Sequence, residues 1–136
     1  MINKENVENI VPHDYKTRGS YSPAKKIDLG GYYLIFVSGV QPPTDNNYVV
    51  LTDNIEEQTE LVFEEINNLL NLAGATIDDV VKAQIFLTNM NDFDKVSTIR
   101  GKWFKNSNPV STLLEVNAMT RKGSKIEIEV TAIIKK

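Results

Sequence analysis

Hydrophobic positions follow a helical period in two parts of the chain. Between residues 54 and 73, apolar residues recur at steps of three and four, which is typical of an amphipathic helix with one buried face. Thr52 or Asp53 is expected to cap its first turn, and Gly74 suits the left-handed residue that follows a helix. Residues 91–104 carry a second apolar stripe with helical spacing. The pattern therefore predicts two helices.

Strand-like runs, either apolar throughout or alternating with polar residues, surround these helices. The runs are residues 26–29, 32–37, 80–87, 111–116 and 125–134. Gly30 and Gly31 separate the first two runs, which predicts a tight hairpin. Residues 1–17 are polar and irregular, and we expect a loosely held arm with room for one short strand. The predicted order is β-β-α-β-α-β-β.

This order predicts a single α+β domain over residues 1–136, in which two helices cover one face of a mostly antiparallel sheet. In the last strand, Glu127 and Glu129 alternate with apolar residues, so one face is buried and the other is polar. Five residues are expected to make other strands apolar on both faces: Tyr33, Ile35, Val37, Ile85 and Leu87. A face of mixed polarity commonly packs against other subunits.

Composition removes several kinds of chemistry. The chain has 136 residues, no cysteine and one histidine, His13, which excludes disulfides, thiolate nucleophiles and metal sites built on cysteines or histidine pairs. No loop has the spacing of a calcium site, so no metal is expected. A net charge of −3 without a basic patch argues against nucleic acid. No apolar run is long enough for a membrane span and no secretory pattern begins the chain, so we expect a cytoplasmic protein.

Two interpretations of Glu127 remain open from the residues alone. As one position of an alternating strand, it simply faces water. Alternatively it lines a cleft between subunits and orients a water molecule, which is a task for a partly desolvated carboxylate. Ser38 lacks the G-x-S-x-G context of a nucleophile and His13 lies in a polar arm, so neither is assigned a catalytic role.

Four stretches of the chain together resemble one known family. They are AGATIDDVVKAQIFLTNMNDFDKV (73–96), SYSPAKKIDLGGYYLIFVSG (20–39), PVSTLLEV (109–116) and KIEIEVTAI (125–133). The first resembles the helix-to-strand link and the L-x-D/N-M/L-x-D-F signature of the Rid family, also called YjgF/YER057c/UK114. The others resemble its N-terminal hairpin and its two C-terminal strands. The resemblance extends over residues 17–134, which is nearly the whole chain.

The resemblance implies a chorismate-mutase-like α+β fold and a homotrimer with clefts between its subunits. Many members of the family are enamine/imine deaminases, which hydrolyse 2-aminoacrylate-type compounds to 2-keto acids and ammonia without a cofactor or metal. In these deaminases an arginine holds the substrate carboxylate and a glutamate positions the hydrolytic water. The implied partners are therefore copies of the same chain and a small carboxylate-type metabolite, with no membrane or nucleic acid.

Carried over by position, the resemblance implies a catalytic Glu127 and substrate-binding positions at Tyr21, Ser38, Ser97 and Ser111. Ser111, however, stands where the deaminases have their arginine. Loss of a charged partner from a carboxylate site costs about 2–4 kcal/mol of transition-state binding, or two to three orders of magnitude in rate. We therefore predict a trimeric metabolite-binding protein with weak or no imine deaminase activity.

Two alternatives stay open. In the first, Arg100 or Arg121 replaces the missing arginine from another direction and the protein is an active deaminase, although both are more commonly surface residues. In the second, the trimer has a regulatory or chaperone-like role, since family members have also been called translation inhibitors or endoribonucleases. The acidic charge gives an RNA-directed role no independent support.

Overall fold

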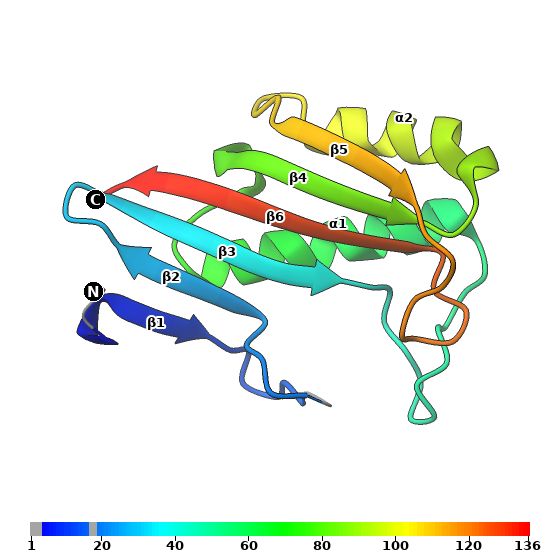
Figure 1. Ribbon diagram of the computed structural model, residues 1–136, viewed down its shortest axis with the longest axis horizontal. Helices are drawn as coiled ribbons and strands as arrows, with labels where there is room; N and C mark the ends of the chain where they lie inside the picture. Colours follow the sequence, from blue (N-terminus) through cyan, green and yellow to red (C-terminus); the bar gives the residue numbers. More distant parts are fainter. Residues whose placement is uncertain (1–3, 17–18) are drawn as a thin grey trace.

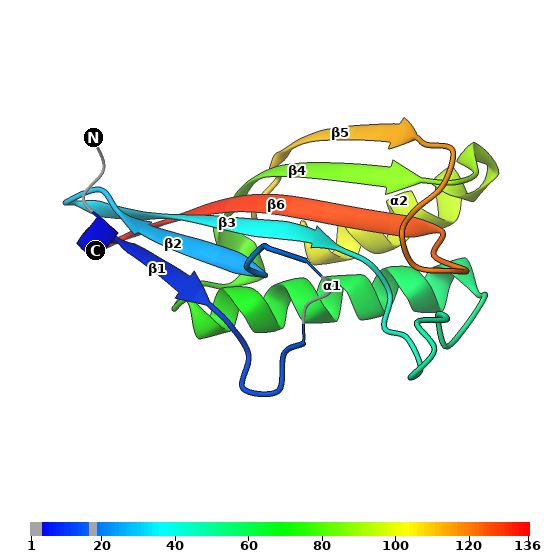
Figure 2. The same cartoon turned by 60° about the horizontal axis from the view of Figure 1, so that its bottom comes forward.

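The computed structural model describes residues 4–16 and 19–136, in which a six-stranded sheet carries two helices on one face (Figures 1 and 2). The strand order is β1-β2-β3-β6-β4-β5. The elements are β1 (Val7–Ile10), β2 (Ala24–Asp28), β3 (Tyr32–Val40), α1 (Ile55–Leu72), β4 (Val80–Leu87), α2 (Phe93–Trp103), β5 (Val110–Glu115) and β6 (Ile126–Lys135).

The predicted α+β architecture is confirmed. Strands β4 and β5 are parallel and are joined through α2, whereas the other neighbouring strands are antiparallel. Gly30 has φ +95°, as the predicted hairpin between β2 and β3 requires. The expected N-terminal strand is β1, which pairs with β2. Residues 1–3 and 17 of the expected arm lie outside the described residues.

Helix α1 ends as predicted but begins differently. Gly74 follows it with φ +86°. Its N-cap is Asn54, whose side-chain oxygen accepts the N–H of Glu57 at 3.0 Å, so the predicted cap at Thr52 or Asp53 is wrong. The Thr52 hydroxyl instead donates to the Glu57 carboxylate at 2.6 Å. The true cap therefore lies one residue after Asp53 and two residues after Thr52.

The core lies between the sheet and the two helices. Two buried side chains of α1 hold neighbouring segments against it. The Phe63 ring on α1 stacks on Trp103 with centroids 5.6 Å apart and meets Phe104 edge to face at 5.1 Å, which ties α1 to the end of α2. The buried Gln58 amide donates to the Gly123 carbonyl at 2.9 Å and accepts the N–H of Lys125 at 2.8 Å. Gln58 therefore fixes the turn before β6.

The two faces of the sheet differ from the predicted assignment. The five apolar residues expected to extend over both faces, Tyr33, Ile35, Val37, Ile85 and Leu87, all lie on the helix-covered face, because strand register places them beside Ile134, Ala132, Val130, Ile128 and Ile126. Other apolar side chains occupy the uncovered face. Phe36, Val110, Leu114 and Ile133 are each between 38% and 68% exposed there. In the described part of the chain, no helix is both long and apolar enough to span a membrane.

Candidate functional site

The predicted site residues fall into two groups on the two sides of one sheet. Glu127 on β6 alternates with buried Ile126 and Ile128, so it belongs to the uncovered side. Ser111 on β5 pairs with buried Ala83, so its side chain lies on the helix side, towards α2. Within one chain, Ser111 and Glu127 therefore cannot face a common ligand.

Tyr21 and Ser38 lie on the Glu127 side of the sheet, and Ser97 and Ser111 lie on the helix side. Strand β3, which carries Ser38, is separated from β5 by three strand spacings, or about 14 Å. Ser97 lies on α2, one of the two helices on the covered face (Figure 2). Glu127 lines neither of the two hollows that Tyr21 and Ser38 share, so the structure groups these two residues without bringing Glu127 into the same hollow.

A chain of hydrogen bonds holds the Glu127 carboxylate. The side-chain amide of Gln41 donates to Glu127 Oε1 at 2.8 Å and to Thr120 Oγ1 at 2.7 Å. The Gln41 side-chain oxygen accepts the backbone N–H of Arg121 at 3.1 Å. We call Gln41, Thr120, Arg121 and Glu127 the glutamate cluster. One carboxylate oxygen is fixed by protein, which leaves Oε2 to accept from a ligand or water.

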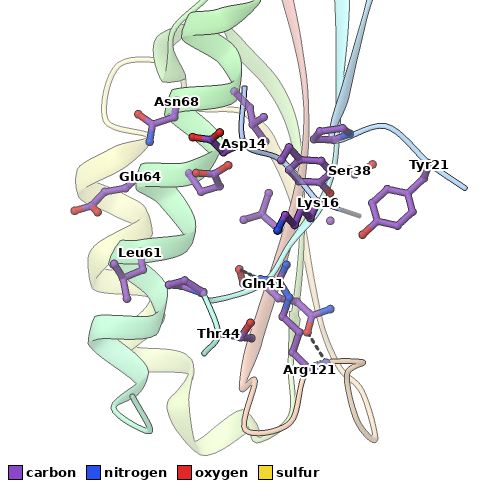
Figure 3. A pocket seen from close by; sticks show the side chains of 17 residues that line it. Asp14, Lys16, Tyr21, Ser38, Gln41, Thr44, Leu61, Glu64, Asn68 and Arg121 are labelled. Carbon is purple, nitrogen blue, oxygen red and sulfur yellow. Dashed lines mark hydrogen bonds between the residues drawn. The ribbon is translucent and has the colours of Figure 1, made fainter. Parts of the chain in front are cut away.

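Arg121 is engaged inside this cluster. Its Nη1 donates to the backbone carbonyls of Gln41 at 3.2 Å and Pro42 at 2.8 Å (Figure 3). A guanidinium bonded to two carbonyls braces the loop after β3. Arg121, one of the two expected replacements for the missing arginine, would have to break both bonds to hold a ligand.

Gly39 is the residue that leaves room for Glu127. A Cβ at this position would lie 2.7 Å from Glu127 Cδ and 2.8 Å from its Oε2. Real Cβ atoms do not approach so closely, so any side chain here would displace the carboxylate. An irregularity in β3 between Val37 and Val40 places Gly39 against β6.

Tyr21 and Ser38 line two adjoining hollows. One is a cavity of about 420 Å³ between α1 and the loops beside β3 (Figure 3), and the other is a groove of about 580 Å³ on the uncovered face. The Ser38 hydroxyl donates to the Ser22 carbonyl at 2.8 Å, while Tyr21 is 54% exposed. Ser38 therefore has a structural bond as well as its predicted site position.

The α1 wall of that cavity carries acidic side chains, among them Glu64 and Glu65. Burial raises the pKa of the Glu65 carboxyl above its ordinary value, against a hydrogen bond from Asn68 and the positive charge of Arg121. The cavity wall therefore holds a carboxyl that resists ionisation.

Ser111 lines a separate cavity of about 390 Å³, which we call the arginine cavity; its lining residues are Arg100, Gly101, Phe104, Asn108, Pro109 and Ser111. Arg100 Nη2 donates to Ser97 Oγ at 3.2 Å. Asn108 adopts φ +44° and donates its N–H to the Phe104 carbonyl at 3.0 Å, which closes a tight link between α2 and β5. The link brings Ser111 beside Arg100.

Gln41 is the site residue that the sequence did not reveal. Its bond to Glu127 crosses 86 residues of sequence, so no local pattern reports it. The available signal is a lone amide directly after a strand that ends near the predicted Ser38 position. Among residues 4–16 and 19–136, no group of three acidic or histidine side chains is placed to hold a metal ion.

Comparison with known proteins finds relatives that match most of the chain. The family model described as endoribonuclease L-PSP matches residues 12–134. The chain is 36% identical to a RutC family protein of Pyrococcus abyssi over 117 residues, which are 86% of this chain and 88% of that protein. It is 30% identical over 115 residues to the 2-iminobutanoate/2-iminopropanoate deaminase of Homo sapiens, with 85% of this chain and 80% of the relative covered.

The fold comparison leads to the same family. The crystal structure of YyfA from Yersinia pestis, described as a Rid family protein of unknown function, matches with a TM-score of 0.81 and 32% identity. The match covers 94% of this chain and 99% of the other. With a family model that spans most of the chain and relatives above 30% identity, this chain belongs to the Rid (YjgF/YER057c/UK114) family.

Proposed function

We propose that this protein is a homotrimer that binds a small carboxylate-type metabolite in clefts between its copies, with weak or no imine deaminase activity. The glutamate cluster of one copy faces the arginine cavity of the next. The observation that carries the proposal is the position of Ser111 and Glu127 on opposite faces of one sheet, which leaves each half of the site incomplete within a chain.

The uncovered face supports association between copies. Exposed apolar side chains on this face, such as Phe36, Leu114 and Ile133, lose contact with water when a second copy packs on them. A ring of three copies repeats one head-to-tail contact, so each glutamate cluster meets one arginine cavity. A cleft of this kind takes residues from both partners.

The geometry around Glu127 supports a hydrolytic role for this residue. Gln41 fixes Oε1 of the carboxylate, and Oε2 packs against Gly39 without a protein hydrogen bond that would occupy it. A water hydrogen-bonded to the free oxygen would add to the carbon of a C=N bond as Glu127 takes its proton. Return of this proton to nitrogen gives a carbinolamine. Glu127 then moves the proton of the new hydroxyl to nitrogen, so that the carbonyl forms as the C–N bond breaks and a keto acid and ammonia are released.

The serine at position 111 supports a low rate. A strand arginine would hold the substrate carboxylate through two parallel hydrogen bonds and fix its C=N carbon against the water. The Ser111 hydroxyl has neither the charge nor the fork geometry. We expect a loss of about 2–4 kcal/mol of transition-state stabilisation, which is two to three orders of magnitude in rate.

The test is a coupled assay in which a threonine dehydratase generates 2-iminobutanoate and keto-acid release is followed with and without this protein. Only slight acceleration is expected, and Glu127→Ala should abolish it, while Ser111→Arg should increase it. In parallel, 2-oxobutanoate should raise the melting temperature of the wild type. Fast hydrolysis by the wild type, or a monomer in light scattering, would contradict the proposal.

A further inference from the structure

Arg100 has a half-buried guanidinium whose capacity for charge pairing is unused. The ion pairs of the described residues are His13–Asp14 and Lys136–Asp28, and none includes Arg100. Its hydrogen bond to the Ser97 hydroxyl uses one of five guanidinium donors. Its other donors have no protein partner among the described residues, so they can bind an anionic ligand.

The guanidinium is also held in one orientation. Arg100 Cζ lies 5.9 Å from the centroid of the Phe93 ring, within range of a cation–π contact, and Ser97 fixes one edge of its plane. Both partners lie on α2 itself. Because the side chain is positioned before any ligand arrives, less conformational entropy is lost on binding.

The arginine cavity is lined by both polar and apolar groups. Arg100, Asn108 and Ser111 supply donors, while Phe104 and Pro109 supply apolar surface. The left-handed Asn108 and its backbone bond to Phe104 hold the link that forms part of the lining. At about 390 Å³, the cavity suits a small molecule with a polar group and an apolar part.

We propose that Arg100, with the hydroxyls of Ser97 and Ser111, binds the carboxylate of a small ligand, so that helix α2 supplies the cation that strand β5 lacks. A planar carboxylate matches two parallel guanidinium N–H groups. Arg121 does not fill this role, since its guanidinium is bonded to the Gln41 and Pro42 carbonyls. The inference rests on the proposed function only for the other end of the ligand, which reaches Glu127 of the neighbouring copy.

A cation on α2 would also explain why the protein binds a carboxylate but hydrolyses an imine only slowly. An anion held mainly by Arg100 would lie nearer to α2 than an anion held by an arginine on β5, so the reacting carbon would be displaced from the water that Glu127 positions. Displacement of about 1 Å from the productive geometry costs about a hundredfold in rate. Affinity is therefore kept while turnover is lost.

The first experiment is calorimetric titration of 2-oxobutanoate into the wild type, Arg100→Gln and Lys102→Gln. Lys102 is an exposed cation on the same helix that does not line the cavity, so it controls for net charge. We expect about ten- to hundredfold weaker binding for Arg100→Gln, from the loss of a charged hydrogen-bonding partner, and unchanged binding for Lys102→Gln. Equal affinity of Arg100→Gln and the wild type would overturn the inference while leaving the proposed function intact.

The second experiment uses the unmodified protein and the smallest carboxylate. Titration with acetate should shift the NMR signal of the Arg100 Nε–H group more than that of Arg121. A shift of Arg100 in a protein that proves monomeric would support the anion site and contradict the trimeric cleft. An Arg100 signal that is unchanged by acetate would overturn the anion site.

Discussion

The glutamate cluster and the arginine cavity, which we propose to be two halves of one site, are held in different ways. In the glutamate cluster, Gln41 joins Glu127, Thr120 and the backbone of Arg121, and the Arg121 guanidinium is bonded to two carbonyls. In the arginine cavity, Arg100 has one hydroxyl partner and no carboxylate partner among the described residues. In the first half, both charged side chains are held by hydrogen bonds to uncharged groups of the chain, whereas in the second half most of the guanidinium donors remain for a ligand.

The two regions are held in place by different interactions. Long-range hydrogen bonds hold the glutamate cluster, so a side chain that displaces one member disturbs the others. Packing of α2 on α1 holds the arginine cavity, through Phe63, Trp103 and Phe104. Substitutions should therefore affect the two regions differently: loss of packing should disturb the arginine cavity, and displacement of a hydrogen-bonded side chain should disturb the glutamate cluster.

Removal of the Phe63 ring, which packs α1 against the end of α2, should cause the largest loss of stability. The loss should disturb the arginine cavity, because α2 carries part of its lining. Phe63 is fully buried, so Phe63→Ala leaves a void and lowers the free energy of unfolding by about 3–5 kcal/mol. Urea unfolding followed by circular dichroism measures the loss. Leu72→Ala, an exposed position on the same helix, should change stability by less than about 0.5 kcal/mol. Similar losses for both variants would show that the ring does not anchor α2.

A methyl group at Gly39 should disturb the glutamate cluster with a moderate effect. The added Cβ displaces the Glu127 carboxylate and breaks its bond to Gln41, with a cost of about 1–2 kcal/mol. Thermal unfolding measures the loss, and the coupled assay should show that residual activity disappears. Full stability and activity of Gly39→Ala would contradict the role assigned to this glycine.

A glycine-to-alanine substitution in the arginine cavity, at Gly101, should increase stability instead of lowering it. A Cβ at Gly101 meets no atom within 4 Å, and the residue lies inside α2. Gly101→Ala should therefore raise the free energy of unfolding by about 0.5–1 kcal/mol, because alanine favours helix. Binding of 2-oxobutanoate should remain. Destabilisation by Gly101→Ala would mean that this half is packed as tightly as the other.

The smallest expected effect concerns pH and Glu65, which lies beside Arg121. Because burial raises the pKa of the folded Glu65 carboxyl above its ordinary value of 4.5, its ionisation costs stability as pH rises through the folded pKa. Glu65→Gln should raise the melting temperature at pH 7 and change little at pH 4. The gain should stay below about 1 kcal/mol, since solvent screens a partly exposed carboxyl. A larger gain at pH 4 than at pH 7 would contradict the direction of the shift.

Much of the fold was predictable because each helix or strand shows its hydrophobic repeat within its own short segment of sequence. Residues 80–87 were predicted as a strand and form β4 with those bounds, and α1 differs from residues 54–73 by one residue at each end. The faces of the sheet were harder to predict. Tyr33, Ile35 and Val37 alternate with apolar Leu34 and Phe36, so only the pairing with β6 decides which set is buried.

The family resemblance proposed members for the site but not their assembly. It implied Glu127 as a site residue and placed Ser111 where the family has an arginine, and it left Arg100 and Arg121 as alternatives. Tertiary hydrogen bonds distinguish these two arginines, because Arg121 is bonded to backbone carbonyls and Arg100 is not. Such bonds join residues far apart in sequence and leave no periodic signal.

The central claim is that the two halves meet between copies, and chemical cross-linking tests it most directly. The chain has no cysteine, so a Ser38→Cys/Ser111→Cys variant carries only the two introduced thiols. Within one chain these positions are three strand spacings, or about 14 Å, apart, beyond the reach of the short cross-linker bis-maleimidoethane. The account predicts covalently linked dimers and trimers on a denaturing gel. Product that remains monomeric would contradict it.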